Sequence, residues 1–223
     1  MNQVTAMRPR DRDTILQALS AGVVPRTGLR HVQVGRAREV AALVRDIDRI
    51  ADSGSAIRFV IGEYGAGKTF FLNLVRLIAL ERRCVTLQAD LAPDRRIHAT
   101  GGQARQLYAE AVRNMATRTK PEGGALASIV ERFITECAKD AENRSAQVER
   151  AIDERLAGLH EHLGGHDFAS VLKAYWRASE DGDEMLKAAA LRWLRAEYPT
   201  KTEARQALAP EPAERVRPGA RMR

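Results

Sequence analysis

Gly62-Glu63-Tyr64-Gly65-Ala66-Gly67-Lys68-Thr69 fits the pattern G-x-x-x-x-G-K-[ST], in which a glycine-rich loop holds the phosphates of a nucleotide. The glycines let the backbone turn tightly and point consecutive N–H groups inward, and the following helix adds its positive N-terminal end. We expect Lys68 to reach the β- and γ-phosphates and Thr69 to offer its hydroxyl to Mg²⁺. The alternative is a glycine-rich turn without a chemical role. The pattern predicts nucleotide binding by all eight residues.

The sequence on either side of this loop is typical of a strand and a helix. The run Ile-Arg-Phe-Val-Ile at 57–61 is β-branched and aromatic, and it predicts a buried strand. Residues 69–81 predict a strongly apolar helix, and residues 84–89 predict a second strand. A strand–loop–helix–strand unit implies parallel strands joined by a right-handed crossover. We therefore predict the α/β class: a P-loop NTPase core with an incomplete parallel sheet, followed by a large helical second half.

A second candidate feature lies upstream, where Val34-Gly35-Arg36 precedes a predicted amphipathic helix at 36–51. This turn, with Glu39 after it, resembles the adenine-side box of AAA+ and origin-recognition-type ATPases. The resemblance implies that Gly35 and Arg36 border the base of a bound nucleotide. The alternative is a helix start with a solvated arginine. No N-K-x-D segment of the guanine-reading kind is present, so the sequence favours ATP over GTP.

The remainder of the chain is predicted from its periodicity and its breaker residues. Residues 13–21 predict a short helix and residues 30–34 a short extended segment. From Gln103 onward the pattern is helical, with Gly- and Asp-rich breaks and no convincing strand. We expect an N-terminal helix and arm at 1–30, a nucleotide-binding core at 31–102, a helical region at 103–208, and a disordered basic tail at 209–223. Further helices are predicted at 125–141, 145–162, 168–179 and 184–198.

The composition of the chain limits the classes of binding partner that we expect. The chain has 223 residues, a net charge of +7 and 44% hydrophobic residues, which suits a globular protein with a core. Much of the basic excess lies near the two ends, where arginines either bind phosphate backbones or solubilise the chain, so DNA stays open as a partner. Aromatic residues make up only 5%, which argues against a stacking platform for single-stranded nucleic acid.

Targeting and redox signals favour a cytoplasmic location. Residues 1–13 lack the layout of a signal peptide, and no apolar run reaches the roughly 18 residues that span a membrane. Cys84 and Cys137 are far apart in the sequence, without a CxxC partner, so we expect no disulfide framework and no cysteine metal site.

Hydrolysis of a nucleotide needs more than phosphate binding. P-loop ATPases hold Mg²⁺ partly through an acidic residue at the end of another strand. The candidate here is Asp90, directly after the predicted strand at 84–89; the alternative is an Asp that caps a loop. No segment reads as a Walker B strand ending in Asp-Glu, so enzymatic turnover is left undecided.

Several stretches together resemble the ATP-binding proteins associated with BREX-type bacteriophage-defence systems (BrxD-like). The resemblance spans roughly residues 12 to 208 and implies an AAA+-like ATPase that uses ATP and Mg²⁺ and acts with protein partners in a defence or stress locus. It leaves an oligomer open. Members of that family are longer, and their Walker B strand lies beyond the end of this chain, which predicts a truncated, frameshifted or split version. The stretches are 20–26, 34–36, 62–69, 89–96, 100–104, 113–114, 117–119, 123–126, 190–194 and 200–205.

Three functions remain open at this point. The first is an ATP-binding P-loop protein of the BREX type, with Lys68 and the loop amides on the phosphates. The second is a nucleotide-gated interaction module that does not hydrolyse ATP and docks partners through its helical half. The third is a small-molecule P-loop kinase with an Arg-bearing helical lid, for which no acceptor site is legible.

Overall fold

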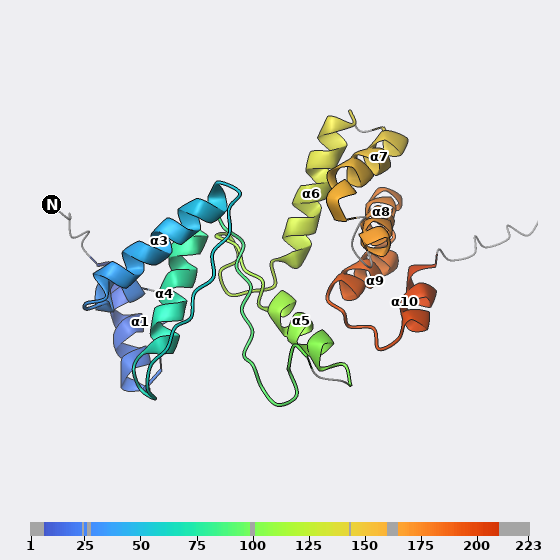
Figure 1. Cartoon of the computed structure of the whole chain (residues 1–223). Helices are drawn as coiled ribbons and strands as arrows, with labels where there is room; N and C mark the ends of the chain where they lie inside the picture. Colours follow the sequence, from blue (N-terminus) through green and yellow to red (C-terminus); the bar gives the residue numbers. More distant parts are fainter. Residues whose placement is uncertain are drawn as a thin grey trace, which may run out of the picture. The chain divides into compact units, whose positions relative to one another are not determined.

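The structure, a computed structural model, describes residues 7–23, 25, 28–98, 101–142, 144–159 and 165–209. Within these residues the chain is helical (Figure 1), and it divides into two compact units. Unit 1 comprises Met1–Thr86 and Ala116–Pro121, and unit 2 comprises Leu87–Met115 and Glu122–Arg223. In chain order the helices are α1 (Pro9–Ser20), α2 (Leu29–Val32), α3 (Ala37–Ala51), α4 (Lys68–Glu81), α5 (Gln103–Arg113), α6 (Leu126–Asp140), α7 (Ser145–Arg155), the 3-10 turn η1 (Ala157–Leu159), α8 (Gly165–Asp181), α9 (Glu184–Leu194) and α10 (Lys201–Leu208).

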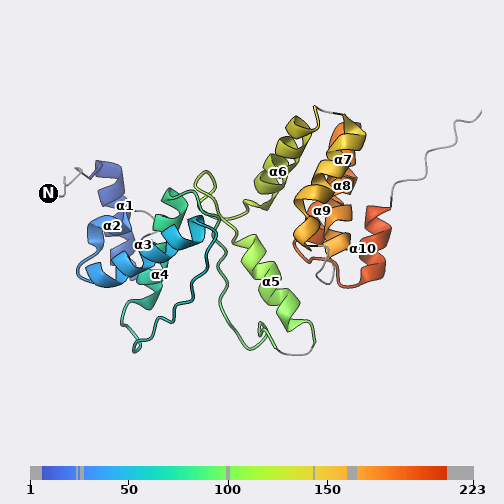
Figure 2. The same ribbon diagram turned by 45° about the horizontal axis from the view of Figure 1, so that its top comes forward.

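Unit 1 is built around α4, which packs against α2 and α3 (Figure 2). The predicted apolar face of α3 supplies the buried Ile47, and α4 supplies the buried Phe71 and Leu74. Arg76 of α4 also donates to the carbonyl oxygen of Pro121, a contact that holds the second segment of this unit. These contacts set the position of the glycine-rich loop, because that loop leads directly into α4.

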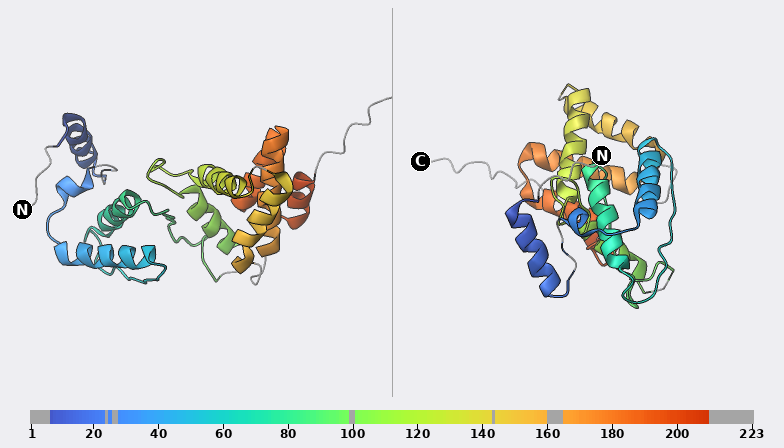
Figure 3. Two further views of the ribbon diagram at one scale, coloured as in Figure 1. Left: turned by 90° about the horizontal axis from the view of Figure 1, so that it is seen from above. Right: turned by 90° about the vertical axis from the view of Figure 1, so that its left-hand side faces the viewer.

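Unit 2 contains a larger hydrophobic core. Helices α6 to α10 gather into one cluster (Figure 3), in which α8 packs most extensively on α9. Ion pairs cross its surface; the Nε of Arg177 on α8 lies 2.6 Å from the carboxylate of Glu149 on α7. The core residues are Val112, Leu126, Val130, Ile134, Cys137, Ala138, Ala141, Val148, Ile152, Leu156, Ala169, Val171, Leu172, Tyr175, Trp176, Ala190 and Leu194.

The predicted parallel-sheet α/β core is wrong. In the part of the chain that the structure describes, no residues form a sheet, and the pairing is limited to two isolated antiparallel bridges, Thr86 with Ala116 and Ala92 with Arg95. Residues 57–61 are extended but have no partner strand, and Phe59 and Ile61 are 87% and 93% exposed. Among the described residues, the predicted second strand makes no bridge to them; its Thr86 instead exchanges both backbone hydrogen bonds with Ala116. A β-rich run becomes a sheet strand only where another strand satisfies its backbone groups.

The helix predictions agree better with the structure than the strand predictions do. The predicted helices at 36–51 and 69–81 correspond to α3 and α4 within one residue at each end. The segment at 30–34 was expected to be extended, but α2 covers most of it, so that prediction is wrong. Tyr175 and Trp176 are buried in the core of unit 2.

Some predictions fall outside the described residues. These include the arm at residues 1–6, the tail from 210 to 223, and the predicted end of the helix at 145–162. In the ranges that the structure describes, no helix combines the length and the apolar character needed to cross a membrane.

Candidate functional site

The glycine-rich loop turns into α4 through left-handed backbone conformations. Gly65 has φ +79° and Gly67 has φ +77°, a region in which residues with a Cβ are strained. Gly67 is the residue before α4, and its carbonyl oxygen accepts the Phe71 N–H at 3.0 Å. A tighter turn precedes it, where the Ala66 N–H donates to the carbonyl oxygen of Glu63 at 3.2 Å. Gly65 and Gly67 therefore occupy backbone conformations that favour glycine.

The Lys68 side chain folds back over the start of the loop. Its Nζ lies 2.8 Å from the carbonyl oxygen of Gly62 and 2.7 Å from that of Glu63. An ammonium group has three N–H donors, and two of them are used in these contacts. In the part of the chain that the structure describes, the third donor has no hydrogen-bond acceptor, so the loop holds a cation that keeps one N–H group free.

The first turn of α4 also presents backbone N–H groups. Within the described residues, the amides of Gly67, Lys68, Thr69 and Phe70 donate to no backbone carbonyl. The first N–H groups of a helix lack partners inside the helix, and the helix dipole adds positive potential at the same end. Free donors and a positive end together favour an anion at this place.

The upstream turn reaches the loop directly. Gly35 and Arg36 are both left-handed, with φ +74° and +54°, and Arg36 is the residue before α3. The Arg36 guanidinium donates to the carbonyl oxygen of Ala66, and its central carbon lies 5.5 Å from the centroid of the Phe71 ring. The Gly35–Arg36 turn and the glycine-rich loop, which are about 30 residues apart in the sequence, are thus in direct contact.

Two cavities of unit 1 border this contact. The smaller, about 320 Å³, lies between the segment 32–36 and the start of α4, with Gly67 in its wall. Its remaining lining is largely apolar and includes Val34 and Phe71. The larger, about 640 Å³, lies between α3 and the extended segment 58–61. Arg36 and Phe71 line both cavities, so the arginine stands between them.

An ion pair fixes the extended segment that leads into the loop. Arg58 donates through two nitrogens to the carboxylate of Asp46 on α3, with Nη2 3.1 Å from Oδ1. These hydrogen bonds hold the pKa of the Asp46 carboxyl below its ordinary value, and the positive charges of Arg45 and Arg49 act in the same direction. The hydrogen bond to Asp46 raises the pKa of Arg58. The pair holds one end of the loop against α3.

The residues expected at a Mg²⁺ site belong to different units. Thr69 lies in the first turn of α4 in unit 1, and its side chain is exposed. Asp90 is an exposed residue of unit 2, so its pairing with Thr69 stays a prediction. Among the described residues, no group of three or more His, Cys, Asp or Glu side chains is suited to a metal ion.

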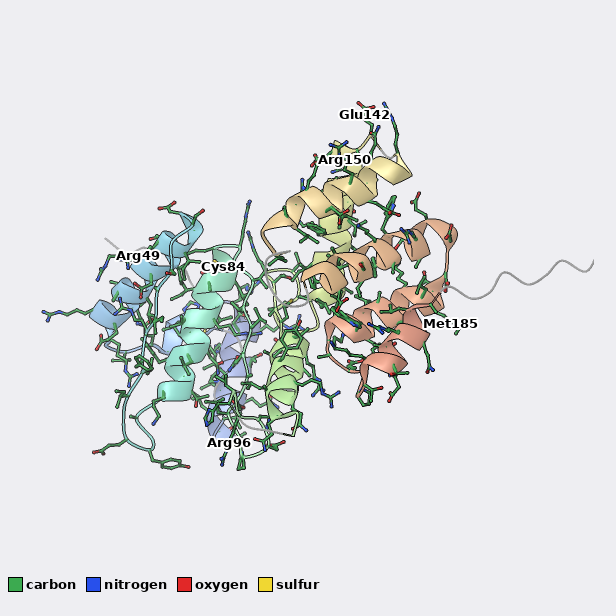
Figure 4. The ribbon with its side chains drawn as sticks, turned by 45° about the vertical axis from the view of Figure 1, so that its right-hand side comes forward. Arg49, Cys84, Arg96, Glu142, Arg150 and Met185 are labelled. Atoms are coloured by element: carbon green, nitrogen blue, oxygen red, sulfur yellow. The ribbon has the colours of Figure 1, made fainter. Side chains whose placement is uncertain are left out.

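The loop after Asp90 carries two arginines with different surroundings. Arg95 pairs with Glu110 of α5 at 3.3 Å, whereas Arg96 is exposed (Figure 4) and makes no ion pair with another described residue. Arg95 is therefore engaged in holding this loop to α5.

Two contacts at the candidate site were not predicted from the sequence. Phe71 was treated as one apolar position of a helix, and nothing in the sequence shows that an arginine 35 positions earlier lies on its ring. The Asp46–Arg58 pair could have been anticipated from the sequence. Arg58 is a charged residue in the otherwise apolar run 57–61, and a charged side chain that is covered by other residues needs a partner.

Comparison with known proteins adds one finding. A family model described as BREX system ATP-binding protein BrxC/D matches residues 7–210. No curated protein and no solved structure matches the chain. The matched range includes the glycine-rich loop, the Gly35–Arg36 turn and Asp90.

Proposed function

Because this chain belongs to the family of the BREX system ATP-binding protein BrxC/D, we propose that its glycine-rich loop is the place where ATP binds. The family itself establishes an ATP-binding role in a BREX system. Our finer proposal is that residues 62–69 form a Walker A loop that holds the triphosphate of ATP·Mg²⁺.

One observation carries this proposal: Lys68 is held by the loop's own carbonyl groups and keeps one donor free beside the free amides at the start of α4. The contacts at 2.8 and 2.7 Å place the ammonium group against the loop rather than in solvent. A triphosphate needs several N–H donors and a compensating positive charge in one place, and backbone amides with a lysine supply both.

The adenine of ATP is proposed to lie at the Gly35–Arg36 turn. The cavity of about 320 Å³ supports this, because it adjoins Gly67 and has a mostly apolar wall. A purine needs an apolar slot with a few backbone polar groups, and segment 32–36 supplies both. In this arrangement the backbone of Gly35 and Arg36 borders the base.

Mg²⁺ is proposed to bind with the nucleotide through the Thr69 hydroxyl. Thr69 follows Lys68 in the first turn of α4 and is exposed, which supports access for the ion. Asp90 remains the candidate for an acidic partner. When bound, Mg²⁺ would neutralise part of the phosphate charge.

Binding without turnover remains the second candidate. In the described residues of unit 1, no carboxylate is bonded to Lys68 or Thr69, whereas the lysine and backbone donors proposed to hold phosphate have free N–H groups. This favours a nucleotide-gated module, whose helical unit 2 would meet protein or DNA partners in cytoplasmic phage defence. A steady-state ATPase assay with and without DNA separates the two, since turnover by the chain alone would exclude a purely binding role.

Isothermal titration of the whole chain with ATP·Mg²⁺ tests the proposal. Lys68→Ala is expected to weaken binding by about 10- to 100-fold, because a hydrogen bond to a charged group contributes about 1.5–3 kcal/mol. The matched control is Lys120→Ala, which removes an exposed lysine of the same unit. Absence of ATP binding in a wild-type chain that is folded by circular dichroism would refute the proposal, as would equal affinities of the two variants.

A further inference from the structure

The contact between Arg36 and the loop joins a side chain to one particular peptide group. Arg36 donates to the carbonyl oxygen of Ala66, so the peptide that it holds is the one between Ala66 and Gly67. A trans peptide is planar, and its C=O and N–H point in opposite directions. With no cis peptide in the described chain, the Gly67 N–H therefore points away from the Arg36 side of the loop.

This peptide has little else to hold its orientation. Gly65 and Gly67, one on each side of Ala66, adopt left-handed φ values that glycine leaves and enters easily. The Gly67 N–H donates to no backbone carbonyl among the described residues. Rotation of the plane would exchange an amide donor for a carbonyl oxygen, which repels phosphate.

Arg36 is itself held in place. Its guanidinium lies over the ring of Phe71, 5.5 Å from the centroid, and Phe71 is only 5% exposed, so the platform is fixed in the core of unit 1. A planar guanidinium stacks on an aromatic face while its N–H groups bond in its own plane, which a lysine cannot reproduce. The left-handed backbone at Arg36 directs the start of α3 from the same residue.

We propose that Arg36 is a positioning residue for phosphate: it holds the Ala66–Gly67 peptide so that the Gly67 N–H faces the bound anion. The inference rests on the proposed function of the loop and assigns to the Arg36 side chain a role separate from the base. It predicts that Arg36 controls affinity for the phosphate chain even when no adenine is attached.

The test compares ATP with inorganic tripolyphosphate, each titrated into the whole chain. Arg36→Met removes the donors and keeps an apolar stem against Phe71. We expect it to weaken both ligands by about tenfold, a loss equivalent to about 1.4 kcal/mol. Arg36→Lys keeps the charge without the planar fork, and we expect about a threefold loss for both ligands. The control is Arg38→Met, which removes one positive charge from an exposed residue in the first turn of α3. We expect this variant to lose less than twofold in affinity for either ligand.

A second readout follows the peptide itself. In ¹⁵N-labelled protein without ligand, the Gly67 amide resonance should shift in Arg36→Met and stay in place in Arg38→Met, while far-ultraviolet circular dichroism stays unchanged in both. If Arg36→Met does not fold, Arg36→Lys carries the test with the same ligands.

The outcomes separate the two proposals. Wild-type protein that binds neither ATP nor tripolyphosphate would overturn the proposed function and this inference with it. Wild-type binding of both ligands, with Arg36 variants that lose ATP but keep tripolyphosphate, would assign Arg36 to the base and overturn only the positioning role. If the Arg36 variants lost no more affinity than Arg38→Met, Arg36 would contribute only its positive charge. That result would also overturn the positioning role.

Discussion

The carboxylate of Asp46 on α3 accepts hydrogen bonds from two nitrogens of the Arg58 guanidinium, with Nη2 3.1 Å from Oδ1. Asp46 is buried, whereas Arg58 belongs to an extended segment without a partner strand. The pair therefore does part of what a sheet would do: it holds the segment that leads into the glycine-rich loop against a helix. The stability of unit 1 should depend on this contact.

Asp46→Asn is expected to lower the urea midpoint of unit 1 at pH 7, because it removes the charge that Arg58 pairs with. The pKa of Asp46 is lowered in the folded state from its ordinary value of 3.8, chiefly by the hydrogen bonds from Arg58. The stabilisation is thus complete about one pH unit above 3.8, and it is lost as the pH falls through the folded-state pKa. Urea unfolding followed by circular dichroism at pH 7, 5, 4 and 3 measures this.

The matched control is Asp52→Asn, which changes an exposed carboxylate just after α3 that forms no ion pair with a described residue. The gap between wild type and Asp46→Asn should narrow toward pH 3, and the control should show no comparable gap at any pH. A gap that is constant with pH would mean that the effect is not electrostatic.

Phe71→Ala and Phe59→Ala should differ sharply in how much they lower the free energy of unfolding. Phe71 is 5% exposed and Phe59 is 87% exposed. Truncating a buried phenylalanine costs about 3–5 kcal/mol, and truncating an exposed one costs within about 0.5 kcal/mol. Urea unfolding gives the free energies, and hydrogen exchange of α4 assigns the loss to unit 1. Similar costs for both variants would contradict the exposed position of Phe59.

Gly67→Ala tests whether the loop needs the left-handed backbone conformation at Gly67, as distinct from the space for a side chain there. A Cβ at Gly67 would meet only the Arg36 Nη2 at 3.8 Å, so there is no overlap, but φ is +77°. A left-handed non-glycine residue costs about 1–2 kcal/mol, and we expect a loss of ATP affinity of about tenfold as the loop relaxes. Isothermal titration measures it. Gly158→Ala, at a site with no close neighbour and no positive φ, should leave the affinity unchanged. Equal behaviour of the two would show that the left-handed turn is not required.

Thr69→Ala should remove the Mg²⁺-dependent part of ATP affinity. The hydroxyl of Thr69 is the expected ligand of the ion, so ATP binding in EDTA should change little while the gain on adding Mg²⁺ shrinks. Titrations with and without Mg²⁺ measure the difference. Thr69→Ser keeps the hydroxyl and should behave like wild type; a serine variant as impaired as the alanine variant would argue against a role for the hydroxyl.

Asp183→Ala should weaken the start of α9 in unit 2. The Asp183 side chain accepts the Leu186 N–H at 2.9 Å, which caps the helix, and losing such a cap costs about 1 kcal/mol. Trp193 lies in the same helix, so its fluorescence reports the unfolding. Asp183→Asn keeps an accepting oxygen and should stay close to wild type. An alanine variant with wild-type stability would exclude a capping role.

Local patterns predicted where the longer helices lie, because a helix satisfies its own backbone within a few residues. The predicted helices at 13–21 and 184–198 nevertheless differ from α1 and α9 by four residues at one end. The apolar spacing of α3 and the helix after the loop were readable from the sequence within one residue at each end. The short helix α2 was missed, since a single turn carries too few residues for a periodic signal.

By itself, the sequence determined the loop chemistry: glycines where φ is positive, a lysine beside them and a helix directly after them, all encoded within eight residues. It also pointed to the family that the comparison established. Only the tertiary structure decided whether the β-rich runs form a sheet and what Arg36 touches. The Thr86–Ala116 bridge and the contacts from Arg36 to Ala66 and Phe71 join residues at least 30 positions apart. Such contacts depend on how helices pack, and no local pattern records that.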